Sequence, residues 1–220
     1  MLRDRIKNIR LLREFALRWR HWYSKRSFIN GRNNRIQNNG IKIATRIQIS
    51  GSDNTVVIED DAVVRDCLIK ISGNHNKVLI SKNAYLAGAE LWVEDNCCKL
   101  SVGENTFVGH HSHLACTENN STLTVGNDCM LSSFVQIRTG DSHSILDLNG
   151  RRINPASDVV ISNHCWIGEG AKILKGTFLD SDSIIATGAI VKGTYPTNVI
   201  VAGNPAKILK NGVTWDSRRL

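Results

Sequence analysis

An apolar residue recurs at every sixth position between residues 161 and 191. The series consists of Ile161, Ile167, Ile173, Leu179, Ile185 and Val191. An α-helix repeats every 3.6 residues and a β-strand every two, so neither element produces this spacing. A chain that turns a corner after each six residues points every one of these side chains inward, and three such steps close one triangular coil. The pattern therefore predicts a stack of short strands, with small residues such as Gly168 and Ala186 beside the sharp corners.

A longer version of the same unit lies upstream. Its inward positions are Ile58, Ile80, Val102 and Val125, which are 22, 22 and 23 residues apart. These coils are longer than the 18 residues that three six-residue steps give, and we expect the additional residues to lie in the turns. Stacked coils would pair as parallel strands about 4.8 Å apart, each coil burying the next.

The repeat is interrupted once. From Val125 to Ile161 the spacing rises to 36 residues, which indicates an extruded loop at about residues 138–157. A solenoid that interrupts its own repeat usually does so for function, because binding and catalytic residues concentrate on loops held by a rigid scaffold. A tolerated surface insertion is an equally weighted explanation from the spacing alone.

These patterns divide the chain into three segments: residues 1–30, a solenoid over residues 31–210, and a tail over residues 211–220. In the first segment, residues 2–23 have the apolar periodicity of an amphipathic helix. Its apolar face consists of Leu2, Ile6, Ile9, Leu12, Ala16, Trp19 and Tyr23. We expect this α-helix to cap the open first coil or to pack within a trimer. Peripheral binding to an anionic membrane surface is the alternative.

The positive charge is concentrated in this same segment. The chain has a net charge of +8, and residues 1–26 contribute nine Arg or Lys side chains against two carboxylates, which leaves only +1 for the remainder. The nearly neutral body argues against a nucleic-acid partner.

The six cysteines form no CxxC pair, so we expect reduced thiols. The sequence has neither an apolar span nor a signal-peptide core, and we expect a cytoplasmic protein, with residues 1–26 as a potential contact to the inner membrane face.

Four segments together resemble the hexapeptide-repeat acyltransferases, and within them the polysaccharide and sugar O-acetyltransferases. They are GDSHSILDLNG (140–150), VVISNHCWIGEGAKILKG (159–176), IIATGAIVKGTYP (184–196) and AGNPAKILK (202–210). The resemblance implies an all-β solenoid of the left-handed parallel β-helix type, acetyl-CoA as the acyl donor, and a homotrimer with CoA grooves between neighbouring chains. Flat prism sides also suit cyclic packing. The chain departs from the family in the turn before Trp166, where Asn163-His164-Cys165 replaces the more usual Val before Trp, a change that should be neutral for packing. It also departs at Thr187 and at Lys192–Gly193, which affects individual CoA contacts.

Acetyl transfer to a sugar hydroxyl requires a base near pH 7, because an alcohol is a weak nucleophile until its proton is removed. His143 is the only one of the seven histidines in the extruded loop. It lies between Asp141 and Asp147, either of which could fix the imidazole tautomer. A solvated loop histidine is the alternative, but the family has its catalytic histidine in an equivalent loop. The resemblance therefore implies that His143 is the general base, with Asp141 beside it.

Trp166 precedes the inward Ile167 and should point outward. The resemblance implies that its indole N–H hydrogen-bonds the CoA sulfur and stabilises the departing thiolate; an aromatic side chain in an interface is the alternative. The remaining CoA contacts should come from stacked corners and from nearby lysines. Our candidates are Gly168, Thr187, Gly188, Lys192 and Lys207.

The run His110-His111-Ser112-His113 is a weak candidate for a metal site. Alternate residues of a strand share a face, so at most His111 and His113 could converge, which gives too few ligands. We therefore expect acetyl-CoA as co-substrate and no metal.

The predicted function is O-acetylation of a hydroxyl on a sugar or bacterial surface polysaccharide of the capsule or lipopolysaccharide type. An N-acetyltransferase of amino-sugar nucleotides, a trimeric γ-carbonic-anhydrase-like metalloprotein and a non-catalytic scaffold are the alternatives.

Overall fold

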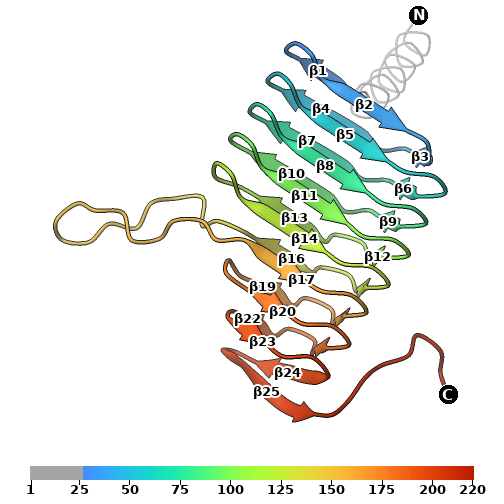
Figure 1. Cartoon of the computed structure of the whole chain (residues 1–220), viewed down its shortest axis with the longest axis vertical. Helices are drawn as coiled ribbons and strands as arrows, with labels where there is room; N and C mark the ends of the chain where they lie inside the picture. Colours follow the sequence, from blue (N-terminus) through green and yellow to red (C-terminus); the bar gives the residue numbers. More distant parts are fainter. Residues whose placement is uncertain (1–26) are drawn as a thin grey trace, which may run out of the picture.

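A computed structural model describes residues 27–220, in which three parallel sheets form the sides of one long solenoid (Figure 1). Sheet A contains β1 (Phe28–Asn30), β4 (Arg46–Ser50), β7 (Leu68–Ser72), β10 (Glu90–Glu94), β13 (His113–Cys116), β16 (Gln136–Arg138), β19 (Lys172–Ile173) and β22 (Ile190–Val191). Sheet B contains β2 (Arg35–Asn38), β5 (Thr55–Ile58), β8 (Lys77–Ile80), β11 (Lys99–Val102), β14 (Thr122–Val125), β17 (Val159–Ile161), β20 (Phe178–Leu179) and β23 (Thr194–Tyr195). Sheet C contains β3 (Ile41–Ile43), β6 (Val63–Arg65), β9 (Tyr85–Ala87), β12 (Phe107–Val108), β15 (Met130–Leu131), β18 (Trp166–Ile167), β21 (Ile184–Ile185), β24 (Val199–Gly203) and β25 (Ala206–Asn211).

The six-residue pattern correctly predicted the core. Its six apolar side chains are at most 1% exposed and are distributed over the three sheets in rotation. The upstream positions are also confirmed, because Ile58, Ile80, Val102, Val125 and Ile161 lie in register on sheet B. Each inward side chain is therefore covered by the coils above and below it, and the all-β solenoid is stabilised mainly by this continuous apolar core.

The location of the additional residues in the longer coils was predicted wrongly. On sheet A, β7 has five residues whereas β19 has two, and on sheet B the strands β8 and β20 have four and two. The longer strands direct two apolar side chains inward where the short ones direct one, as Leu100 and Val102 do on β11. The additional residues therefore widen the apolar core and do not lengthen the turns.

Seven successive corners from sheet B to sheet C, beginning with the corner between β5 and β6, each place one residue in the left-handed backbone region. These residues are Asp61, Asn83, Asn105, Asp128, His164, Asp182 and Asn198, with φ between 54° and 60°. Asn and Asp tolerate this conformation better than most residues with a side chain. These corner residues form a row along the solenoid, in which neighbouring side chains lie within hydrogen-bonding distance. In this row His164 Nδ1 lies 2.8 Å from Asp182 Oδ1. This row borders the segment that carries Trp166.

The C-terminal end of the solenoid is covered by an antiparallel strand. β25 pairs with β24, so β24 does not end the sheet with an unpaired edge. The tail beyond it then runs back along the solenoid (Figure 1), where Asn198 Nδ2 donates to Val213 O and Trp215 Nε1 donates to His164 O at 2.8 Å. The tail is therefore held against the same corners as His164.

The predicted basic helix over residues 2–23 lies outside the described residues. Within residues 27–220 no helix has the length and apolarity needed to cross a membrane. All six cysteines are free thiols, and only Cys97 is exposed. Burial raises the pKa of Cys67 to about 11, which keeps that thiol protonated near neutral pH.

Candidate functional site

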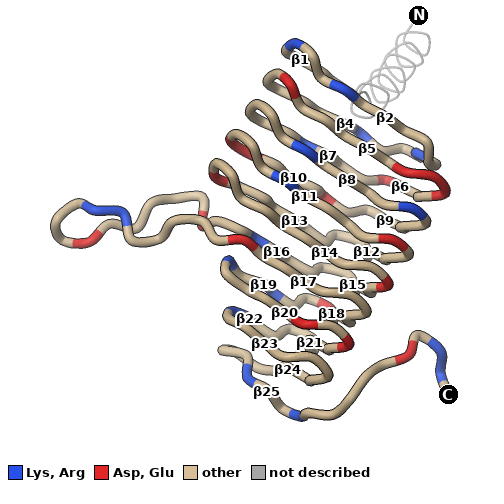
Figure 2. The backbone as a smooth tube through the Cα atoms, in the orientation of Figure 1, with Lys and Arg blue, Asp and Glu red and all other residues tan. Residues whose placement is uncertain are grey.

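The predicted loop is confirmed as an extrusion from one corner of the solenoid. It joins β16 to β17, occupies residues 139–158 and projects far from the stacked coils (Figure 1). Asp147 Oδ1 accepts hydrogen bonds from the backbone N–H groups of Asn149 and Arg151, both at 2.9 Å, and thereby shapes the tip. Acidic and basic positions are close together there (Figure 2). The loop is thus an ordered turn with local hydrogen bonds.

An ion pair at the base attaches the loop to the solenoid. Lys175 Nζ lies 2.6 Å from Asp141 Oδ2 and also donates to the carbonyl of Asn154 at 2.8 Å. The buried Asn154 amide donates to the same Asp141 oxygen and to the carbonyl of His143. The Lys175 ammonium, followed by the Asn154 amide, lowers the pKa of Asp141. Asp141 therefore fixes the backbone that carries His143.

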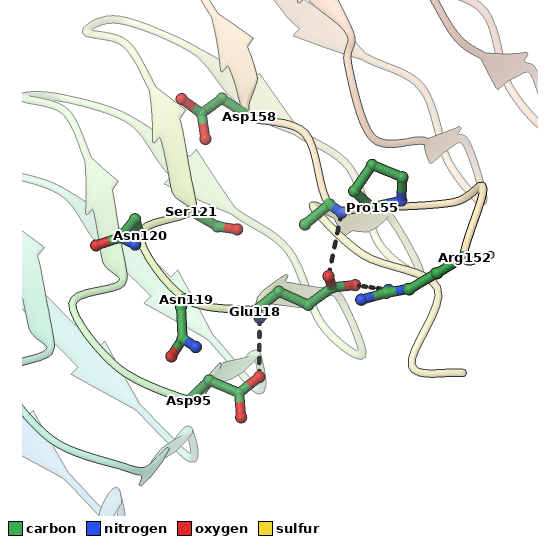
Figure 3. A pocket seen from close by; sticks show the side chains of 9 residues that line it. Asp95, Glu118, Asn119, Asn120, Ser121, Arg152, Pro155 and Asp158 are labelled. Carbon is green, nitrogen blue, oxygen red and sulfur yellow. Dashed lines mark hydrogen bonds and ion pairs between the residues drawn. The ribbon is translucent and has the colours of Figure 1, made fainter. Parts of the chain in front are cut away.

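A second ion pair attaches the returning limb of the loop. Arg152 Nη2 lies 2.6 Å from Glu118 Oε1, and Glu118 Oε2 accepts the backbone N–H of Ala156 at 3.2 Å (Figure 3). The Arg152 guanidinium is the main cause of the lowered pKa of Glu118. Beside this pair lies a polar cavity of about 410 Å³ that Asp95 and Asp158 also line. Both limbs of the loop are thus fixed by charged side chains.

His143 is exposed on the loop that these contacts hold. The expected carboxylate partner of its imidazole is not found among residues 27–220. Asp141 binds Lys175 and Asn154, while Asp147 binds the backbone of its own turn. The structure therefore fixes the position of His143 through its main chain and leaves the imidazole open to solvent.

Trp166 points outward from β18, as predicted, and is 37% exposed. Its neighbours in register on sheet C are Met130 and Ile184. The tail residue Trp215 lies beside it, with ring centroids 6.2 Å apart, and stacks on His164 with centroids 4.7 Å apart and an interplanar angle of 12°. Trp166 is therefore partly exposed and is flanked by the Trp215 ring.

Three of the five further CoA candidates share one corner of the solenoid. Gly168 lies so close to the next coil that an added Cβ would be 2.5 Å from the backbone nitrogen of Thr187. Gly188, the next residue, donates its N–H to Glu169 O at 2.8 Å. Lys192 lies at a different corner, after β22, and Lys207 is exposed on β25. The structure thus brings Gly168, Thr187 and Gly188 together but places the two lysines elsewhere.

The histidine run does not lie on a single strand, which corrects the geometry expected from the sequence. His111 occupies a corner with φ of 58° and stacks on Phe134 at 5.0 Å, whereas His113 begins β13 and meets the edge of Trp92. Over the part of the chain that the structure describes, no three His, Cys, Asp or Glu side chains are grouped so as to hold a metal ion.

The sequence analysis named Asp141 but as a partner of His143, and it did not identify Lys175, Glu118 or Arg152 as residues that anchor the loop. Asp141 is separated from Lys175 by 34 residues, and Glu118 from Arg152 by the same number. The feature that could have indicated them is the presence of charged residues at the corners on either side of the interrupted repeat. Trp215 was also missed, because nothing in the repeat indicates where a tail beyond the last coil will pack.

Replacing Lys175 by methionine should release the loop base while keeping the length of the side chain. We expect tryptic cleavage after Arg151 or Arg152 to become several-fold faster at pH 7, measured by mass spectrometry. The Lys172→Met variant is a matched control, because Lys172 on β19 has no ion pair among residues 27–220. Equal cleavage rates in the two variants would show that the ion pair does not hold the loop.

The same ion pair predicts a pH dependence. The pKa of Asp141 is lowered in the folded protein, so its stabilising contribution is fully present above the ordinary aspartate pKa of about 3.9. The contribution is lost as the pH falls through the lower, folded-state value. The accessibility of the loop should therefore stay constant from pH 8 to about pH 5, when cleavage by an acid-stable protease is normalised at each pH to its cleavage of an unstructured peptide. Loop opening already at pH 6 would contradict this.

The geometry can be compared with known proteins. No family model matches the chain. The polysialic acid O-acetyltransferase of Escherichia coli O1:K1 is 37% identical over 94 residues, which are 42% of this chain and 31% of that protein. The putative lipopolysaccharide biosynthesis O-acetyl transferase WbbJ of Escherichia coli K12 is 30% identical over 116 residues, 48% of this chain and 57% of that protein. The aligned segments thus span less than two thirds of these relatives.

Solved structures match over a larger share of the chain. The polySia-specific acetyltransferase NeuO has 31% identity and a TM-score of 0.81, covering 87% of this chain and 82% of that one. The polysialic acid O-acetyltransferase OatWY has 29% identity and a TM-score of 0.84, with 89% and 92% covered. The chain therefore belongs to the hexapeptide-repeat acetyltransferases. Within this family it is similar to the polysialic acid and lipopolysaccharide O-acetyltransferases.

Proposed function

We propose that this protein transfers the acetyl group of acetyl-CoA to a hydroxyl of a bacterial surface polysaccharide. The observation that carries the proposal is the match to a polySia-specific acetyltransferase over 87% of the chain. The interruption of the solenoid by an anchored loop with an exposed histidine agrees with it, because this chemistry needs a base that the acceptor can reach.

In the proposed reaction, His143 is the general base. It takes the proton of the acceptor hydroxyl as that oxygen attacks the thioester carbonyl, and the carbon–sulfur bond then breaks to release CoA. Asp141 acts as a positioning residue, because its contacts to Lys175 and Asn154 hold the main chain of the loop. The outward indole of Trp166 donates its N–H to the leaving sulfur, an interaction that strengthens as negative charge develops.

We propose that the donor lies against the corner formed by Gly168, Thr187 and Gly188. The close approach at Gly168 leaves a flat backbone surface there, which suits the pantetheine arm. Lys192 and Lys207 are proposed contacts for the CoA phosphates, since ammonium groups bind phosphate as point charges. Both lysine side chains are exposed and free to move toward a bound ligand.

We also propose left-handed winding and a homotrimeric assembly, as the family resemblance implies. Large apolar side chains of the loop support a partner chain: Leu148 and Ile153 are 107% and 60% exposed in the single chain. A neighbouring chain that covers them would place His143 between two solenoids and could supply its imidazole with a partner. Residues 1–26, with their net +7 charge, are proposed to bring the trimer to membrane-associated glycan synthesis.

The proposal is tested by following free-thiol release from acetyl-CoA in the presence of a glycan panel. The panel contains polysialic acid, lipopolysaccharide polysaccharide, a neutral glucan and an amino-sugar nucleotide. We expect glycan-dependent thiol release with polysialic acid or the lipopolysaccharide polysaccharide. Release that depends only on the amino-sugar nucleotide would establish N-acetylation instead, and release with none of the four would overturn the proposed function.

A further inference from the structure

Three buried polar atoms have no hydrogen-bond partner among residues 27–220, and the residues that carry them line the same cavity. The atoms are Trp92 Nε1, Thr117 Oγ1 and Arg138 Nε. The cavity has a volume of about 320 Å³ and is also lined by Glu94, His113, Ala115 and Ser142. An unpaired buried polar group destabilises a folded protein, so three such groups around one cavity indicate a site built for a ligand with several polar atoms.

The cavity lies on the outer face of sheet A. In register across three coils, Trp92 on β10 lies opposite Ala115 on β13, which lies opposite Arg138 on β16. The methyl group of Ala115 is only 2% exposed although it belongs to an outward row. A small residue between two large ones leaves a hollow, and Ala115 forms its floor.

The cavity adjoins the base of the extruded loop. Arg138 Nη2 donates to Ser142 Oγ at 2.9 Å, and Ser142 immediately precedes His143. Thr117 lies directly below the point where the chain enters the loop, because a Cβ added to Gly140 would be 2.6 Å from Thr117 Oγ1. The unpaired groups are therefore located next to the segment that presents the proposed base.

The lining residues combine the features that recognise a sugar ring. The indole N–H and guanidinium N–H donate hydrogen bonds, the Glu94 carboxylate accepts them, and the Thr117 hydroxyl does both. The Trp92 ring adds apolar surface to the lining, and one of its faces is covered by Lys70 Nζ, 3.7 Å from the ring centroid. Burial lowers the pKa of His113, which keeps that imidazole neutral and able to accept a hydrogen bond. The volume is at the small end of ligand pockets and fits one monosaccharide unit.

We propose that this cavity is an acceptor subsite that binds one sugar unit of the glycan and thereby presents a neighbouring unit to His143. The inference rests on the proposed function and specifies which surface holds the acceptor. Sugar oxygens would satisfy Trp92 Nε1, Arg138 Nε and Thr117 Oγ1 together once small side-chain movements turn these buried atoms into the cavity. The site is distinct from the corner proposed for the donor, which follows sheet C.

Two conservative variants test the subsite through the kinetics of the acceptor. Trp92→Phe keeps the ring but removes the N–H, and Thr117→Val keeps the shape but removes the hydroxyl. Each should raise the KM for the glycan that the wild type acetylates, polysialic acid or the lipopolysaccharide polysaccharide, by about 3–10-fold, the effect of losing one neutral hydrogen bond. The KM for acetyl-CoA and the kcat should change less than twofold. Gln48→Ala is the matched control, because Gln48 lies in the same outward row, two coils from Trp92.

A binding measurement separates this inference from the proposed function. In ¹⁵N-labelled protein, the Trp92 indole resonance is identified by its loss in Trp92→Phe. A short oligomer of the glycan that the wild type acetylates, polysialic acid or the lipopolysaccharide polysaccharide, is then added without acetyl-CoA. We expect this resonance to shift and Thr117→Val to weaken the titration. If the wild type acetylates glycan but the resonance does not shift and both variants retain the acceptor KM, the cavity holds only water and the inference is wrong. If no glycan is acetylated, the proposed function itself fails.

Discussion

Replacing His143 by alanine is expected to lower kcat by roughly 10²–10⁴-fold, the range for loss of a general base. Binding of CoA should be nearly unchanged, because the side chain is exposed on the loop and no candidate CoA contact depends on it. The free energy of unfolding should also remain the same, since no hydrogen bond from the imidazole occurs among residues 27–220. Steady-state kinetics and calorimetric CoA titration measure the two effects separately.

The matched controls are the other histidines near the coils. His164→Ala removes the stacking partner of Trp215 and the contact to Asp182, and it should lower kcat far less. His111→Ala removes a stacking contact with Phe134 and a tilted ring contact with His110. If either of these variants abolishes turnover while His143→Ala retains it, the base does not lie on the loop and the reaction takes place on the coil faces.

Replacing Trp166 by alanine is expected to impair both donor binding and turnover. The variant loses the packing surface as well as the N–H that we propose to contact the sulfur, so the KM for acetyl-CoA should rise and kcat should fall, each by about tenfold or more. Trp166→Phe separates the two contributions: it should restore most of the donor affinity and little of kcat. Both constants are measured at saturating acceptor.

Phe107→Ala is the appropriate control for this position. Phe107 also points outward from sheet C, belongs to the same row and is likewise 37% exposed, but it lies two coils away. Its removal should leave both kinetic constants within twofold of the wild type. If both kinetic constants worsen equally in the Phe107 and Trp166 variants, the outward residues of this sheet C row serve packing between chains. Trp166 would then have no separate role at the CoA sulfur.

The core and the loop could be predicted from sequence because both are visible in the spacing of apolar residues along the chain. Each inward residue, such as Ile167, is buried by the neighbouring coils, and coil length is regular within each half of the solenoid, so the repeat itself gives the position of the core. A break in that repeat gives the location of the loop. The prediction failed where strand length mattered, because a coil of 22 residues can be lengthened in its turns or in its strands, and only the side chains packed inside β7 and β8 decide between them.

The contacts around the site required the three-dimensional structure. Lys175 meets Asp141 because a corner one coil away passes under the loop, and Trp215 meets His164 because the tail reverses direction. Neither relation follows from periodicity, since both join residues more than 30 positions apart. The cavity at Trp92 was likewise hidden, because it depends on the small size of Ala115 between two larger neighbours in register.

The most direct test of the central claim is to follow the transferred group itself. Acetyl-CoA labelled with ¹³C in the acetyl carbonyl is incubated with the protein and polysialic acid, and the purified glycan is examined by carbon–proton correlation NMR. The proposed function predicts a new ester carbonyl coupled to a sugar proton on an oxygen-bearing carbon, and its loss in the His143→Ala variant. A labelled amide, or labelled acetate released with no label on the glycan, would contradict hydroxyl-directed acetyl transfer.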